Sequence, residues 1–93
     1  MQFQREQGRI FALDDSGKLI AEVTYPAVNG ISDIEHTFVD DSLRGQGVAA
    51  QLMEAAAQEI RAAGLSAKLT CPYAVKWFAQ HPEHADLLWN DAP

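Results

Sequence analysis

The sequence predicts an α/β (α+β) fold in which an N-terminal antiparallel three-stranded meander is followed by a helix, a parallel strand and a C-terminal helix. Apolar residues alternate with polar ones through much of the first forty positions, which is typical of half-buried strands. Residues 48–63 instead carry apolar side chains three and four positions apart, as an amphipathic helix does. A short glycine-rich segment, residues 44–49, joins the two regions.

The first two predicted strands form a hairpin with one apolar face. Residues 9–13 lead into Asp14-Asp15-Ser16-Gly17, a cluster of residue types that favour a tight turn. The strand that follows has an apolar side chain at every second position, namely Leu19, Ala21, Val23 and Tyr25.

A third antiparallel strand should follow Asn29-Gly30, the residue pair that a type I′ hairpin turn favours, and extend to Val39. Alternation slips inside this strand, because Ile31 is out of phase with Ile34 and Phe38, and Val39 shifts the phase again. A phase change indicates a β-bulge, which redirects backbone groups near a site. A strand buried on both faces would give the same pattern.

The long helix should end at Gly64, because glycine is favoured just past a helix C-terminus. A strand over residues 65–70 should run parallel to the third strand, since a helix links the two. Pro72 suits the first position of a helix that continues over residues 73–80, and residues 82–89 favour one or two further helical turns. The apolar stripe of the long helix comprises Val48, Leu52, Ala56, Ile60 and Ala63, and its polar face comprises Gln51, Glu54, Gln58 and Arg61.

Length and composition indicate one globular domain, residues 1–93, with a modest core. Apolar residues make up 47% of the chain and charged residues 22%, which argues against a disordered tail. The 13 acidic and 7 basic residues give a formal charge of −6, which argues against nonspecific nucleic-acid binding. The same charge weakly favours a cationic substrate such as an amine.

Cys71 is the only cysteine, so the chain forms no intramolecular disulfide and a reducing compartment is expected. No apolar stretch approaches the length of a membrane span, and residues 1–8 lack the apolar region of a signal peptide. We therefore expect a cytoplasmic protein that binds neither membrane nor nucleic acid.

Arg44-Gly45-Gln46-Gly47-Val48-Ala49 is the segment that most strongly suggests a ligand. A glycine-rich loop that enters a helix leaves backbone N–H groups unpaired at the positive end of the helix dipole, which suits a phosphate. Gly45 and Gly47 allow the backbone to approach the anion, and Arg44 adds a permanent cation. The spacing fits neither the mononucleotide P-loop nor the dinucleotide fingerprint. Taken alone, the segment could also be a strand-to-helix turn without a ligand.

Together with three further segments, this loop resembles the compact single-domain branch of the GNAT N-acetyltransferase superfamily. The resemblance implies acetyl-CoA or coenzyme A as the cofactor, and a strand that splays from the next parallel strand to admit the pantetheine arm. It also implies that backbone groups of Thr37, Phe38 and Val39 contact pantetheine, while Arg44, Gly45, Gln46, Gly47, Val48 and Ala49 surround the pyrophosphate. The matching segments lie between residues 34 and 88 and read His36-Thr37-Phe38-Val39, residues 43–49, Cys71-Pro72-Tyr73 and His81-Pro82-Glu83.

Two features depart from the pattern of larger members. Residues 1–30 contain no counterpart of the N-terminal helices that build the amine-binding wall, which implies an open acceptor site or a protein partner that completes it. Where such proteins carry Asn-x-x-Ala-x-x-x-Tyr, this chain has Cys71, Ala74 and Phe78. Phe78 cannot supply the proton that the tyrosine hydroxyl gives to the departing thiolate.

Cys71, His36 and Tyr73 are the candidates for a catalytic role. Cys71 precedes a predicted helix whose dipole favours a thiolate, so it should be accessible and more acidic than a free thiol. It could protonate the leaving group, accept the acetyl group or only pack as a small apolar residue. His36 could draw a proton from the amine through water or bond within the sheet, and Glu35 should point to the opposite face unless a bulge intervenes. Tyr73 could replace the missing acid or be an ordinary half-buried tyrosine.

The remaining aromatic residues, Trp77, Phe78 and Trp89, are expected to build the core rather than a ligand site. His81 and His84 are three positions apart, but Pro82 interrupts the helix and no third ligand has a convincing spacing. The sequence therefore predicts no metal site.

The leading hypothesis is transfer of an acetyl group from acetyl-CoA to a primary amine by direct attack on the thioester. Transfer through an acetyl-Cys71 intermediate is a variant of this hypothesis. The alternative is an acyl-CoA-binding or sensing module without turnover, and a purely structural interaction domain would require that no coenzyme A binds.

Overall fold

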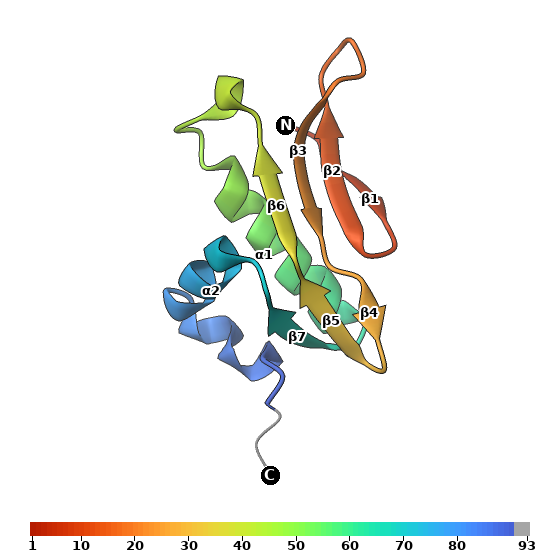
Figure 1. The fold of residues 1–93 in the computed structure, drawn as a ribbon, viewed down its shortest axis with the longest axis vertical. Helices are drawn as coiled ribbons and strands as arrows, with labels where there is room; N and C mark the ends of the chain where they lie inside the picture. Colours follow the sequence, from red (N-terminus) through yellow and green to blue (C-terminus); the bar gives the residue numbers. More distant parts are fainter. Residues whose placement is uncertain (91–93) are drawn as a thin grey trace.

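The computed structural model describes residues 1–90, which form two small β-sheets with a long helix packed across one face (Figure 1). The predicted α/β (α+β) class is confirmed. One sheet is antiparallel with the strand order β1-β2-β3-β6, and the other has the order β4-β5-β7. The elements are β1 (Gln4–Glu6), β2 (Arg9–Leu13), β3 (Leu19–Thr24), β4 (Ala27–Val28), β5 (Ile31–Ile34), β6 (His36–Val39), η1 (Asp41–Leu43), α1 (Val48–Ala62), β7 (Ser66–Leu69), α2 (Pro72–Ala79) and η2 (Pro82–Leu87).

Two short strands, β1 and β4, lie outside the predicted meander. All three residues of β1 are exposed, so the sequence shows no alternation of apolar and polar residues there. The strand nevertheless pairs antiparallel with β2. β4 pairs with β5 across Asn29-Gly30, whose φ angles of 54° and 81° are positive as a type I′ turn requires. The turn itself is as predicted, but it joins β4 to β5.

The predicted third strand is two strands, β5 and β6, that belong to different sheets. β5 runs parallel to β7, β6 runs antiparallel to β3, and the break falls at Glu35. Ile34 is fully buried, and Thr37 lies opposite the buried Val23, so both side chains face α1. Because three positions separate these two inward-facing residues, the period of two slips by one residue at the break. The phase change read from the sequence marks this break.

The apolar stripe of α1 covers both sheets, because the helix contacts β2, β3 and β6 in one and β7 in the other. Each large side chain that is fully buried there stabilises the fold by roughly 1.5–3 kcal/mol. The buried residues of the helix are Val48, Leu52, Met53, Ala56, Ala57 and Ile60.

The C-terminus of α1 is closed by backbone hydrogen bonds. Ala63, predicted to belong to the stripe, is exposed because the helix ends at Ala62. Gly64 has a φ of 71°, and its N–H donates to the carbonyl of Arg61, as expected of a glycine at a helix end.

The C-terminal part of the chain packs beside α1. β7 runs parallel to β5, and Pro72 is the first residue of α2, both as predicted. Side-chain contacts tie η2 to α1. Arg61 Nη1 lies 2.7 Å from Asp86 Oδ2, Arg61 Nη2 lies 3.2 Å from His84 Nδ1, and His84 Nε2 lies 2.6 Å from Glu54 Oε2. No helix within residues 1–90 is both long enough and apolar enough to cross a membrane.

Candidate active site

The parallel strands β5 and β7 separate beyond Ile34, and this separation creates the site. The carbonyl oxygen of Ile34 accepts hydrogen bonds from the N–H groups of Thr70 (3.1 Å) and Cys71 (2.9 Å). From there the segment after β5 turns toward β3 and forms β6, while the segment after β7 continues into α2 (Figure 1). β6 pairs with β3 along one edge, and its other edge has no strand partner within the described chain. The structure thus contains the splayed strand pair that was expected.

The loop between β6 and α1 presents unpaired backbone N–H groups. Gly47 is the N-cap of α1, has a φ of 71° and supplies no capping side chain. In residues 1–90, the N–H groups of Val48, Ala49 and Ala50 have no hydrogen-bond acceptor. Gly45 also has a positive φ, 81°, and a Cβ on either glycine would meet no atom within 4 Å. The first turn of α1 is therefore open to an anion.

Asp40 fixes the start of this loop. Its Oδ2 accepts hydrogen bonds from the hydroxyl of Ser42 (2.6 Å) and from the N–H of the same residue (3.1 Å). These two bonds, the hydroxyl first, lower the pKa of Asp40, so the carboxylate is charged and holds the turn at neutral pH.

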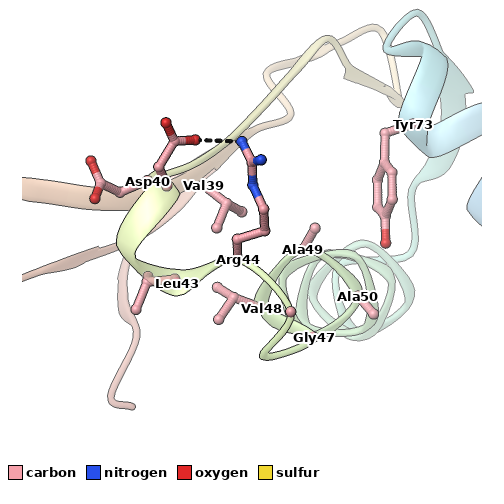
Figure 2. A pocket seen from close by; sticks show the side chains of 11 residues that line it. Val39, Asp40, Leu43, Arg44, Gly47, Val48, Ala49, Ala50 and Tyr73 are labelled. Carbon is pink, nitrogen blue, oxygen red and sulfur yellow. Dashed lines mark hydrogen bonds and ion pairs between the residues drawn. The ribbon is translucent and has the colours of Figure 1, made fainter.

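A cavity of about 260 Å³ lies between the loop and α2. Figure 2 shows the ring of Tyr73 extending from α2 toward Ala49 and Ala50 in the first turn of α1. Arg44 is 81% exposed and holds Asp41, with 2.8 Å between Nη2 and Oδ1. Burial raises the pKa of Tyr73, so its hydroxyl stays protonated and can donate a hydrogen bond into this cavity. The lining residues are Val39, Asp40, Asp41, Leu43, Arg44, Gly45, Gly47, Val48, Ala49, Ala50 and Tyr73.

Three residues predicted to contact the cofactor, Gln46, Thr37 and Phe38, do not line this cavity. The N–H of Gln46 donates to the carbonyl of Leu43 at 3.2 Å, so it serves the loop itself. Phe38 lies opposite Glu22, on the sheet face away from α1. For Thr37 and Phe38 the predicted contact is through the backbone along the free edge of β6, which the structure leaves possible.

Cys71 lies where the segment that leads from β7 to α2 separates from β5 and β6. It is the N-cap of α2 and only 7% exposed, so the expectation of an accessible thiol is wrong. Its Sγ lies 3.5 Å from Oγ1 of Thr37, a contact between side chains that the sequence analysis did not predict. Burial raises the pKa of the Cys71 thiol, but the Thr37 hydroxyl and the N–H groups of Ala74 and Tyr73 outweigh it, and the pKa is lowered overall.

His36 and Glu35 lie on the same sheet face, opposite α1. His36 is directly across from Thr24, and Glu35 borders a surface hollow beside Asp33. Opposite faces were expected for an uninterrupted strand, and the strand break at Glu35 shifts the phase. His36 is 59% exposed, with Nε2 3.9 Å from Oε1 of Glu22, too far for a hydrogen bond.

Trp77 and Phe78 are buried in the core as predicted, whereas Trp89 is 39% exposed and borders the same hollow as Glu35. The backbone N–H of Trp89 donates to the carbonyl of Ala67 in β7. Phe78 packs edge-on against Trp77, so the position that would hold a tyrosine acid faces the interior.

The two C-terminal histidines serve the core. Both rings stack on Trp77, with centroid distances of 3.9 Å for His81 and 5.6 Å for His84. No cluster of three or more residues able to ligate a metal occurs among residues 1–90.

A splayed parallel strand pair beside an open helix N-terminus defines the fold class of the acyl-CoA N-acyltransferases. The chain belongs to the GCN5-related N-acetyl-transferase family, whose model matches residues 9–87.

Individual relatives agree with this family. Protein NATD1 from Gallus gallus is 40% identical over 52 residues, which is 56% of this chain and 47% of that protein. The chain therefore spans about half the length of the curated relatives it matches. A GCN5-like protein from Staphylococcus aureus is similar in structure, with a TM-score of 0.78, 27% identity, and coverage of 98% of this chain and 90% of that one. YhbS from Escherichia coli, solved in complex with CoA, shares the fold at a TM-score of 0.58 and 24% identity, covering 66% of this chain and 38% of its own.

Proposed function

We propose that this protein transfers an acetyl group from acetyl-CoA to a primary amine by direct attack of the amine on the thioester. The observation that carries the proposal is the open first turn of α1, with Gly47 as a side-chain-free N-cap and three N–H groups without acceptors in the described chain. These groups face the cavity that also meets the free edge of β6. Residues 1–93 act as one acyl-CoA-binding domain.

The cofactor lies across the splayed strands. The amides of Gly45 and of residues 47–49, together with Arg44, hold the pyrophosphate, while Gln46 closes the loop through its bond to Leu43. Arg44 exchanges Asp41 for phosphate oxygens. Backbone groups of Thr37, Phe38 and Val39 hold the pantetheine arm along the edge of β6. A pantetheine arm that runs along β6 in this way brings the thioester toward Ile34 and Cys71, where β5 and β7 begin to separate.

The amine approaches from the face opposite α1, because that helix covers the other face. Asp33, Glu35 and Glu22 lie on the open face and attract an ammonium ion. His36 removes the proton from the ammonium through water, and the amine nitrogen then attacks the thioester carbon. The C–N bond forms as the C–S bond breaks, and the nitrogen then loses its second proton to water. The thiolate of coenzyme A takes a proton from water or from Cys71, and in the latter case water reprotonates Cys71.

A second candidate function is acyl-CoA binding without turnover. It is favoured by Phe78, which occupies the acid position and faces the core, and by the absence of an acceptor wall of helices in residues 1–30. In that case a protein partner completes or replaces the acceptor site. Both candidates place the protein in the cytoplasm, where acyl-CoA is available and the lone cysteine stays reduced.

Mass spectrometry of acetylated product separates the two candidates. The protein is incubated with acetyl-CoA and a panel of a monoamine, a polyamine, a peptide α-amine and a lysine peptide, with an alcohol as the control nucleophile. Calorimetric titration with coenzyme A is run on the same sample. We expect binding and enzyme-dependent acetylation of at least one amine. Binding without acetylation of any amine would favour the sensing module, and no binding would overturn both.

A further inference from the structure

A second cavity, of about 410 Å³, lies at the opposite end of α1 from the glycine loop. Its walls come from the β1–β2 turn, the segment after β3 and the last turn of α1. Glu59 borders it and follows Ala49 by ten positions, so the two cavities are about 15 Å apart along the helix axis. Its volume falls within the roughly 300–1,000 Å³ of small-molecule sites.

Tyr25 contributes a polar group to this cavity. The residue is only 6% exposed and lines the cavity. Its backbone is fully used, since its N–H donates to Gly8 (2.7 Å) and its carbonyl accepts from the hydroxyl of Ser32 (2.6 Å). Its phenol oxygen has no hydrogen-bond partner within residues 1–90. The hydroxyl is not sealed from solvent, so it is available to a water molecule or to a ligand that enters the cavity.

The charged groups around the cavity are acidic. Glu6 and Glu59 line it, and no lysine, arginine or histidine does so within the described chain. Two arginines lie on the outer side: Arg9 Nη1 is 3.2 Å from Glu6, whereas Arg5 Nε is 3.7 Å from Glu59, beyond hydrogen-bond range. Glu59 is therefore ion-paired with Arg5, but its carboxylate oxygens accept no hydrogen bond within residues 1–90.

Besides Gln7 and Ser32, the remaining side chains of the wall are apolar. Ile60 and Leu65 form the side nearest the core, and Pro26 covers the side nearest β4. The cavity thus offers one apolar wall, a phenol and a carboxylate without a hydrogen-bond donor. Burial, and then the charge of Glu59, raise the pKa of Tyr25, so the phenol is neutral and can accept as well as donate a hydrogen bond.

We propose that this cavity is a second ligand site, which binds a small organic ammonium ion with an apolar body. The ammonium N–H donates to Glu59 and to the hydroxyl of Tyr25, and the apolar body packs on Ile60 and Leu65. The site is separate from the acyl-CoA cavity, and its ligand is bound without being acetylated. The inference does not depend on the proposed function, because it uses no residue of the acyl-CoA site.

N,N-Dimethylbenzylamine is the probe that tests this site. It is an ammonium ion at neutral pH, keeps one N–H donor and cannot form a stable amide, so acceptor chemistry does not interfere. Benzyl alcohol and benzoate are the neutral and anionic controls of similar size. Backbone amide NMR shifts of the whole protein are followed during each titration, in about 150 mM salt to screen nonspecific attraction.

We expect shifts at Gly8, at residues 25–27 and at residues 59–65, with binding in the order ammonium, alcohol, benzoate. Saturation with coenzyme A should leave these shifts in place. Shifts confined to residues 44–50 or to the Trp89 hollow would overturn the proposal, as would equal binding of the three probes or no binding.

Matched variants locate the contacts. Y25F should weaken binding of the amine by about three- to tenfold, whereas Y73F, at the other cavity, should not change it. E59Q should remove the preference for ammonium over alcohol, whereas E83Q, an exposed acidic residue of η2, should retain it. Unchanged binding in both Y25F and E59Q would overturn the site.

Discussion

Two helices begin on facing sides of the active site, and their N-termini are built in opposite ways. α1 begins at Gly47, without a capping side chain, and its first N–H groups face the cavity. α2 begins at Cys71, which is buried, and Pro72 removes one N–H from its first turn. Cys71 makes no capping hydrogen bond by geometry, so the amides of this helix act on its sulfur only as nearby dipoles.

The same helix dipole can therefore act on an external ligand or on a side chain of the protein itself. At α1 glycine keeps the amides accessible, so the dipole is available to an anion from outside. At α2 the first amides act on a thiol of the chain itself and, after the Thr37 hydroxyl, contribute to its lowered pKa. Whether the first amides of a helix are accessible decides between these two outcomes. A glycine N-cap leaves them open to a ligand, whereas a buried N-cap side chain has its own pKa changed by them.

The largest expected effect comes from closing the open terminus. G47V should weaken coenzyme A binding by about a hundredfold or more, because a β-branched side chain lies between the amides and the phosphate and strains a φ of 71°. G17V is the matched control, since Gly17 has a φ of 87° with no atom near its Cβ and lies in a distant turn. Calorimetry with folded protein measures both. Equal binding by G47V and the parent protein would contradict the phosphate assignment.

The next effect tests the closed terminus. C71A should lower the rate of acetyl transfer by no more than about a hundredfold, the lower end of the roughly 10²–10⁴-fold that a proton donor contributes. Direct attack needs no covalent intermediate, and water can also protonate the thiolate. Steady-state rates with one confirmed amine measure the loss, and C71S serves as the control that keeps a small polar group. An acetyl-Cys71 adduct that passes its acetyl group to the amine at the turnover rate would contradict this prediction.

A smaller effect distinguishes the side chains of the loop from its backbone. R44A should weaken coenzyme A binding by about three- to tenfold, since an exposed charge-assisted contact is partly screened by water. D41N should act in the opposite direction, because Asp41 competes with phosphate for Arg44 at 2.8 Å. Isothermal titration at two salt concentrations checks both, and the R44A loss should shrink at high salt. A salt-independent loss would show that Arg44 acts through packing.

The smallest effect concerns the thiol. T37V removes the hydroxyl that lowers the pKa of Cys71, so the pKa should rise and the pH profile of iodoacetamide alkylation should move to higher pH. At a fixed neutral pH the variant therefore reacts more slowly. T24V, on the opposite sheet face, is the control and should keep the parent profile. A faster reaction in T37V would mean that access, and not acidity, limits this thiol.

Sequence patterns predicted the local features of the site well. The turn at Asn29-Gly30, the end of α1 near Gly64 and the first position of Pro72 follow from the backbone angles each residue type allows. The glycine loop and the apolar stripe of α1 follow from spacing along one helix. Each depends on neighbours in the sequence, so a short window contains the whole physical cause.

Tertiary structure alone decided what lies between distant segments. Thr37 contacts Cys71, which is 34 positions away in the sequence. Glu35 and His36 lie on one face because the chain passes from one sheet to the other between β5 and β6. The cavity beside Tyr25 lies between the β1–β2 turn, the segment after β3 and the last turn of α1. No local propensity encodes such contacts, because their free energy comes from burial and hydrogen bonding between segments that meet only when the chain is folded.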